Sequence, residues 1–187
     1  MLRALLILVT ACFLLDVTIA AAEQRQVTGF HQSLLGDAPP LFDQTGNTPP
    51  PRYLSYLSRQ KYLFLYFGGS QCVPCKKFTP ELIAWYNAHG GGKDFEILLV
   101  GQDSNTDDIK AYMKTAGMPW LAFEKGQKFG KDDPRFERIE EKIDSKYIPT
   151  LVLLDENDKV VARSNDGDKY LGTDVVLKKY LELTKGK

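Results

Sequence analysis

The sequence has few cysteines, tryptophans and histidines and no excess of charge of either sign. Its 187 residues include three Cys, two Trp and two His, and 24 Lys plus Arg balance 24 Asp plus Glu. A chain without a basic surplus lacks the surface that nucleic-acid binding requires, so we expect no nucleic-acid partner. We find no internal repeat and no low-complexity tract. With 43% apolar and 26% charged residues, the composition excludes a disordered tail or a collagen-like chain and fits one compact domain.

The first 22 residues show the pattern of a cleavable secretory signal peptide. Arg3 supplies a positive charge, and an apolar run from Ala4–Leu15 follows. Residues 20–22 are three alanines, which offer an A-x-A cleavage site. Asp16 interrupts the run before it reaches the ~20 apolar residues that span a bilayer. We therefore expect cleavage of residues 1–22 and a periplasmic or secreted protein.

Two alternatives keep the N-terminus on a membrane. The segment can act as an uncleaved signal anchor, or Val-Thr-Ala-Cys at residues 9–12 can act as a bacterial lipobox that makes Cys12 a lipid attachment site. We expect membrane contact only if the N-terminus is retained or lipidated in one of these ways. Cleavage leaves only Cys72 and Cys75, so in an oxidising compartment they pair with each other or with a client protein.

The rest of the chain divides into a polar extension and an α/β domain. Residues 23–52 are polar and rich in proline, which predicts a loosely packed N-terminal extension with a short strand near Ser33–Leu35. In residues 53–187 apolar runs of strand length alternate with helical patterns, and the unbroken run Tyr62–Phe67 predicts a central strand covered on both faces. The other predicted elements are a helical turn at Tyr53–Ser58, strands at Phe95–Gly101 and Trp120–Phe123, a helix from the cysteine motif to Gly90, helices at Thr106–Ala116, Pro134–Ile143 and Thr173–Thr184, and a hairpin of Thr150–Asp155 with Lys159–Arg163. This order predicts a mixed β-sheet with helices on both faces.

The chemistry of the chain is concentrated in a C-x-x-C motif, Cys72-Val-Pro-Cys75. The motif follows the predicted central strand and a Gly-Gly-Ser turn, so Cys72 stands at the start of a helix. Unpaired N–H groups and the positive end of the helix dipole favour thiolate over thiol there, and we expect a lowered pKa for Cys72. The spacing lets Cys75 attack a mixed disulfide formed on Cys72, so one cysteine is the nucleophile and the other resolves. Pro74 at the helix start loses no hydrogen bond and fixes the turn.

Three other interpretations of the cysteines compete with this one. A zinc site needs two further ligands, and only His31 and His89 remain, at no recognisable finger spacing. We therefore expect no metal, and nothing in the sequence implies an organic cofactor. A purely structural disulfide between Cys72 and Cys75 closes too small a loop to restrain much of the unfolded chain. A redox-inactive binding module that keeps the cysteines for packing stays open.

The motif also carries a family resemblance. Residues 66–83, with the C-x-x-C and Pro80, together with Met118–Ala122 and Tyr147–Val152, resemble the thioredoxin superfamily and are most similar to its tryparedoxin and nucleoredoxin branch. The resemblance covers residues 53–163 and implies a thioredoxin-like fold for residues 53–187. It implies that Cys72 is the nucleophile, that Cys75 is the resolving cysteine, and that Pro149 is a cis-proline whose loop faces the cysteines. A cis bond exposes the backbone of the preceding residue to an extended client. The expected substrate-binding residues are Gln71, Val73, Pro74, Ile148 and Pro149.

The sequence departs from the family pattern at three positions. Family members usually carry Trp where Gln71 and Gln102 stand here. Thioredoxin proper has a buried aspartate where Tyr66 stands, so the proton transfer of the resolving step is not assigned to a carboxylate at that position. Glu81 and Asp103 are the alternative candidates for it. We interpret three aromatic side chains as ordinary core residues, namely Tyr66, Trp85 and Trp120.

The sequence thus predicts an exported thiol:disulfide oxidoreductase that reduces the disulfides of client proteins through Cys72 and Cys75. Its expected partners are protein disulfide or thiol clients and a membrane-linked or secreted thiol reductant. The chain also has some similarity to the periplasmic thioredoxins of cytochrome c maturation. A disulfide-forming oxidase or isomerase would share the same motifs, and a non-catalytic partner-binding module with the thioredoxin fold is a further alternative.

Overall fold

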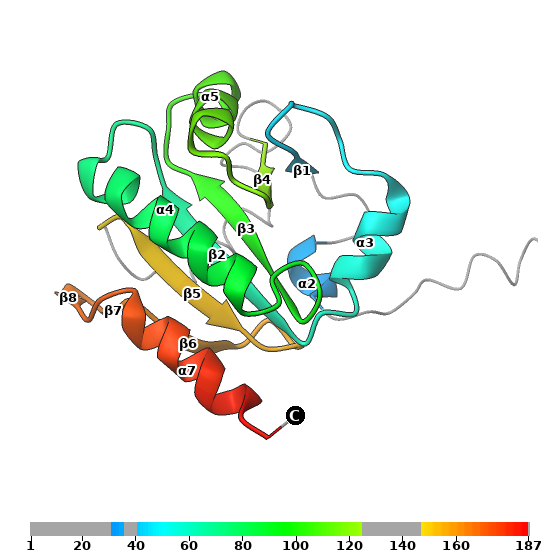
Figure 1. Cartoon of the computed structure of the whole chain (residues 1–187), viewed down its shortest axis with the longest axis vertical. Helices are drawn as coiled ribbons and strands as arrows, with labels where there is room; N and C mark the ends of the chain where they lie inside the picture. The colour runs from blue at the N-terminus through cyan, green and yellow to red at the C-terminus, as the bar shows by residue number, and fades with distance from the viewer. Residues whose placement is uncertain (1–30, 36–40, 125–146, 187) are drawn as a thin grey trace, which may run out of the picture.

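Six strands form one mixed sheet in the order β1-β4-β3-β2-β5-β6 (Figure 1). The computed structural model describes residues 31–35, 41–124 and 147–186. The strands of this sheet are β1 (Leu41–Phe42), β2 (Tyr62–Gly68), β3 (Phe95–Gly101), β4 (Leu121–Phe123), β5 (Thr150–Leu154) and β6 (Val160–Arg163). Strand β2 is buried along its whole length and pairs in parallel with β3 and antiparallel with β5. The prediction of a central strand there is confirmed.

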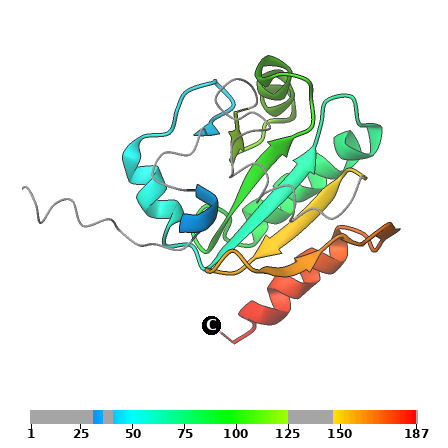
Figure 2. The ribbon, with the colours of Figure 1, turned by 180° about the vertical axis from the view of Figure 1, so that it is seen from behind.

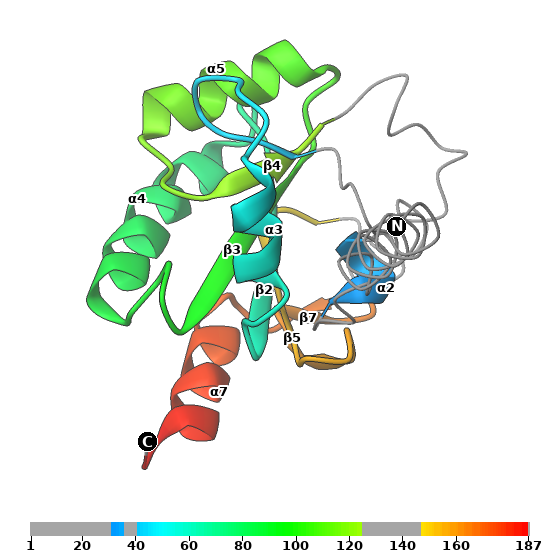
Figure 3. The same cartoon turned by 90° about the vertical axis from the view of Figure 1, so that its right-hand side faces the viewer.

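Helices cover both faces of the sheet, as the sequence predicts. Figure 1 looks onto the face that carries α4 and α7, Figure 2 looks onto the opposite face, and Figure 3 shows the sheet between them. Phe64 and Tyr66 of β2 pack with the first set of helices, whereas Leu63 and Leu65 pack with the second, because successive strand residues point to opposite faces. The first set is α4 (Val73–Ala88), α5 (Thr106–Ala116) and α7 (Asp174–Thr184), and the second is α2 (Gln32–Leu35) and α3 (Pro51–Leu57).

Two described parts of the N-terminal extension, residues 31–35 and 41–42, are packed into the domain, so the prediction of loose packing is wrong for them, whereas none of residues 43–52 is buried. Leu34, Leu35 and Leu41 are buried, and β1 pairs antiparallel with β4 at the sheet edge. The strand predicted near Ser33–Leu35 is also wrong. The N–H groups of Leu34 and Leu35 both donate to the carbonyl of His31, which closes the helical turn α2. Two consecutive buried leucines fit one side of such a turn, whereas a half-buried strand would alternate.

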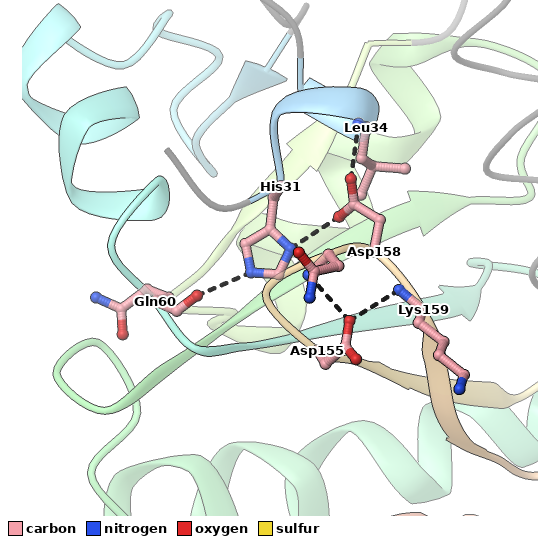
Figure 4. Close-up of polar contacts among 7 residues, drawn as sticks. His31, Leu34, Gln60, Asp155, Asp158 and Lys159 are labelled. Carbon is pink, nitrogen blue, oxygen red and sulfur yellow. Dashed lines mark hydrogen bonds and ion pairs between the residues drawn. The ribbon is translucent and has the colours of Figure 1, made fainter. Parts of the chain in front are cut away.

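A buried polar cluster holds this extension against the turn between β5 and β6 (Figure 4). The Nδ1 atom of His31 lies 2.8 Å from Oδ1 of Asp158, and its Nε2 atom lies 2.9 Å from the carbonyl oxygen of Gln60. The other carboxylate oxygen of Asp158 accepts a hydrogen bond from the N–H of Leu34 at 3.1 Å. Buried polar groups need partners. The cluster therefore fixes the position at which the extension joins the domain.

Most other predicted elements are confirmed. Strand β3 and helix α5 have the predicted bounds, and β5 with β6 forms the predicted antiparallel hairpin. A second hairpin, of β7 (Asn165–Asp166) and β8 (Lys169–Tyr170), was not predicted. The predicted signal peptide at residues 1–22 and the predicted helix at Pro134–Ile143 lie outside the described residues. None of the helices that the structure describes is long and apolar enough to cross a membrane.

Glu96 is a buried carboxyl group that connects helices from both faces of the sheet. It accepts hydrogen bonds from the hydroxyl of Tyr53 on α3 at 2.8 Å, from the hydroxyl of Tyr86 on α4 at 2.9 Å and from the N–H of Ile97 at 2.9 Å. Burial raises the pKa of the Glu96 carboxyl, and the three hydrogen bonds offset that rise only in part. The folded protein therefore holds a proton on Glu96 more tightly than the unfolded chain does.

This difference predicts a pH-dependent effect of Glu96→Gln. As the pH rises from the ordinary glutamate value through the raised one, the wild-type protein loses free energy of unfolding, because the folded state binds more protons in that interval. Glutamine keeps the shape, since its oxygen can accept from Tyr86 and Ile97 and its amide can donate to the Tyr53 hydroxyl oxygen. Urea unfolding should show the stability of the variant relative to wild type increasing across that interval and then levelling off. A relative stability that is the same at every pH would contradict this account.

Candidate active site

Cys72 is the N-cap residue of α4, in the loop that leaves β2 at Gly68. Its Sγ accepts a hydrogen bond from the N–H of Cys75 at 3.1 Å, and its carbonyl accepts one from Lys76 at 3.1 Å. The first turn of α4 carries no acidic residue, and Pro74 stands at its start. The sulfur of Cys72 therefore lies at the positive end of the helix, where a donated N–H favours thiolate over thiol.

The two cysteines form a disulfide, with their Cα atoms 5.2 Å apart, but they differ in exposure. Cys75 is fully buried, whereas Cys72 is half-buried. Cys75 therefore offers no exposed surface to an incoming thiol or disulfide, whereas Cys72 is partly exposed. This geometry fits the division into a nucleophilic and a resolving cysteine.

The segment before β5 lies directly beside Cys72. In the antiparallel pair of β2 and β5, Phe67 stands opposite Thr150, so the residues before Thr150 reach the same end of the sheet as the cysteines. The peptide bond between Ile148 and Pro149 is cis, and the carbonyl oxygen of Ile148 lies 3.6 Å from the Sγ of Cys72. The fold thus brings together three residues that the sequence analysis identified, namely Cys72, Ile148 and Pro149.

A groove of about 580 Å³ opens next to the disulfide, within the size range of ligand pockets. Pro74, Ile148 and Pro149 line it, whereas Gln71 and Val73 are exposed beside the cysteines and do not. The remaining lining residues are Lys77, Phe78, Glu81, Tyr147, Asp168, Tyr170 and Thr173.

The sequence analysis missed the part of the groove that the β7–β8 hairpin forms. Asp168 and Tyr170 belong to this hairpin. The signal that marks it is the dipeptide Gly167-Asp168, which forms the two-residue loop between the strands, and Gly167 adopts a φ of 55°. The strands are two residues long, so they carry no alternating pattern that would have revealed them.

Asp103 holds the loop that precedes Cys72. Its side chain is buried in the segment after β3, and its two oxygens accept from the N–H of Ser70 at 2.9 and 3.1 Å. The Ser70 hydroxyl donates to the same carboxylate at 2.6 Å. Glu81, the other candidate for proton transfer, is exposed on α4 and lines the groove. The contacts of the Asp103 carboxylate are with Ser70, so Asp103 stabilises the conformation of the loop before Cys72.

Three buried hydroxyl groups converge beneath Cys75. Thr79 donates from Oγ1 to the carbonyl of Cys75 at 2.9 Å, and its oxygen lies 2.8 Å from the hydroxyl of Tyr66 and 2.7 Å from that of Tyr112. Since Thr79 uses its one hydrogen on Cys75, both tyrosines donate to Thr79. Burial raises the pKa of the Tyr66 hydroxyl, so it stays neutral. The position that holds an aspartate in thioredoxin proper is thus part of a neutral network, and Tyr66 is more than a core aromatic.

The tryptophans pack as the sequence predicts. Trp120 is fully buried, and Trp85 is half-buried in the aromatic core. Among the residues that the structure describes, no group of three or more His, Cys, Asp or Glu side chains is placed to hold a metal ion.

Comparison with known proteins identifies related sequences. The model of the Thioredoxin-like family matches residues 60–160. Probable nucleoredoxin 1 of Arabidopsis thaliana is 34% identical over 107 residues, which cover 57% of this chain and 17% of that protein. Tryparedoxin of Trypanosoma brucei brucei is 45% identical over 62 residues, which cover 33% of this chain and 42% of that protein. The matches span less than half the length of these relatives.

Solved structures show the same architecture. Tryparedoxin II from C. fasciculata has 26% identity and a TM-score of 0.58, with 83% of this chain and 90% of that chain covered. Tryparedoxin I from Leishmania major has 30% identity and a TM-score of 0.55, with 82% and 94% covered. The mixed sheet with helices on both faces is therefore the fold of these proteins.

The hydroxyl network predicts the cost of removing its centre. Thr79→Val keeps the shape of the side chain but removes the bond to the carbonyl of Cys75 and the acceptor of both tyrosines, whose hydroxyls lie 3.4 Å apart and keep only each other as partners, which should lower the free energy of unfolding by about 2–3 kcal/mol. Tyr112→Phe removes a donor and should cost less. The matched control Thr115→Val, at an exposed position of α5, should stay near wild type in chemical denaturation. Equal losses for Thr79→Val and Thr115→Val would refute the network.

Proposed function

This chain belongs to the Thioredoxin-like family of oxidoreductases, and on that premise we propose that it reduces disulfide bonds of client proteins through Cys72 and Cys75. The observation that carries the proposal is the asymmetry of the cysteine pair. One cysteine is partly exposed at the N-terminus of α4, and the other is fully buried one turn further along. A purely structural disulfide has no need of a partly exposed cysteine at a helix N-terminus.

The first step is attack by the Cys72 thiolate on the client disulfide. A bond forms between the Sγ of Cys72 and one client sulfur, the client S–S bond breaks, and the other client sulfur leaves as a thiolate that takes up a proton. The helix N-terminus and the N–H of Cys75 stabilise the attacking thiolate. The backbone of Ile148, beside Cys72, offers a place for an extended client segment to pair.

The second step releases the client. The thiol of Cys75 loses its proton and attacks the Sγ of Cys72, so the Cys72–Cys75 disulfide forms and the remaining client sulfur leaves as a thiolate that is protonated. Two electrons pass from the protein dithiol to the client. The network of Tyr66, Thr79 and Tyr112 fixes the first turn of α4 without placing a charge there.

The oxidised protein then needs a dithiol reductant to start again. We assign this role to a membrane-linked or secreted thiol donor, because residues 1–22 have the pattern of an export signal. The proposed location is periplasmic or extracellular.

Two single substitutions test the proposal. In a dithiothreitol-driven assay of insulin disulfide reduction, Cys72→Ser should reduce no faster than dithiothreitol alone, because it lacks the nucleophile. Cys75→Ser that is reduced beforehand, freed of dithiothreitol and then mixed with oxidised insulin should accumulate with the client attached to Cys72, visible as a mass shift that reductant removes. Wild-type protein that reduces insulin no faster than dithiothreitol alone would indicate a partner-binding module, and a wild-type rate in Cys72→Ser would contradict the role of Cys72. Trapping by Cys72→Ser instead of Cys75→Ser would reverse the assignment of the two roles.

A further inference from the structure

The groove beside the disulfide has two walls of different origin. One wall is the exposed side of α4, with Phe78 among its residues, and the other is the β7–β8 hairpin with Tyr170. Figure 1 shows the hairpin at the same edge of the molecule as the start of α4 and the start of β5. The family match ends at residue 160, before the hairpin begins. The second wall is therefore made by residues that the match does not include.

Exposed apolar side chains are concentrated around this groove. Tyr147 is 53% exposed and Tyr170 is 47% exposed, and both line it. Val73 lies next to Cys72 and Leu171 next to Tyr170. Of the five large hydrophobic residues that are exposed in the described part of the chain, only Leu183 lies elsewhere, near the end of α7. Clustered exposed apolar residues mark an interaction site, whereas single ones need no explanation.

The charged residues of the groove are mostly acidic. Glu81 extends from α4 and Asp168 from the hairpin, so each wall carries one carboxylate, and Lys77 is the one cation among the lining residues. The ion pairs within the described residues involve neither Glu81 nor Asp168. A positively charged side chain between the walls would meet a carboxylate on each side.

We propose that the β7–β8 hairpin selects the client, and that its preferred substrate is an extended polypeptide with a large apolar and a basic side chain next to the disulfide-bonded cysteine. The groove starts at Pro74, between the two cysteines, so side chains that neighbour the attacked cysteine fall into it. Its mostly apolar lining favours such a segment over a small, hydrophilic disulfide, which would gain nothing from burying Phe78, Tyr147 and Tyr170. This inference rests on the proposed reductase function.

The test uses three disulfide-containing peptides that differ only beside the attacked cysteine, where they carry Phe and Lys, Ser and Lys, or Phe and Glu. The pre-reduced wild-type protein should reduce the Phe/Lys peptide about 10-fold faster than either of the others, measured as a second-order rate constant. Tyr170→Ala should abolish the preference for Phe over Ser. Asp168→Asn should diminish the preference for Lys over Glu. Leu183→Ala, which removes an exposed apolar side chain outside the groove, should keep both ratios.

The possible outcomes distinguish client selection by the β7–β8 hairpin from the proposed disulfide reductase activity. Equal rates with all three peptides, or unchanged ratios in Tyr170→Ala and Asp168→Asn, would overturn selection by the hairpin while the reductase activity stands. Faster reduction of glutathione disulfide than of the Phe/Lys peptide would overturn it in favour of a small substrate. Failure to reduce any of these disulfides would overturn the proposed function itself.

Discussion

Strand β2 pairs with β3 on one side and with β5 on the other, and the geometry around the cysteines depends on where these strands end. In the parallel pair Gly68 lies opposite Gly101, so the loops after both strands emerge together and the carboxylate after β3 reaches the loop before Cys72. In the antiparallel pair Phe67 lies opposite Thr150, so the segment before β5 arrives at the same place. A slip of one residue in either register would exchange the two faces of the strand. Such a slip would bring Phe64 and Tyr66 to the face where Leu63 and Leu65 pack, so the different packing of the two faces opposes it.

Elements with strong local signals could be predicted from the sequence. Helix α5 has the expected bounds because Asn105 caps its N-terminus and Gly117, with a φ of 69°, ends it in the left-handed conformation. The extension could not be predicted in the same way. Strand β1 is two residues long, and its place in the sheet depends on pairing with β4, a contact between distant parts of the chain. Proline and polar residues in this segment suggested loose packing, but the buried pair of His31 and Asp158 holds it in place.

The same distinction applies to the candidate site. The C-x-x-C and the residues around Pro149 belong to short local motifs, so both could be identified as candidate site residues from the sequence alone. The hydroxyl network could not be predicted, because Tyr66, Thr79 and Tyr112 come from three elements and only the fold brings them together. Its consequence is chemical as well as structural. The hydroxyl network places no charge beneath the buried cysteine, and the helix N-terminus favours the thiolate of Cys72.

The reduction potential of the Cys72–Cys75 couple tests the central claim most directly. Purified protein is equilibrated with glutathione or dithiothreitol redox buffers, and its free thiols are counted at each poise. A reductase should exchange reversibly, with a potential near about −270 mV, the value of thioredoxin. A potential near about −120 mV would contradict the direction of electron flow and indicate an oxidant. A pair that neither reduces nor reoxidises would contradict the redox function altogether.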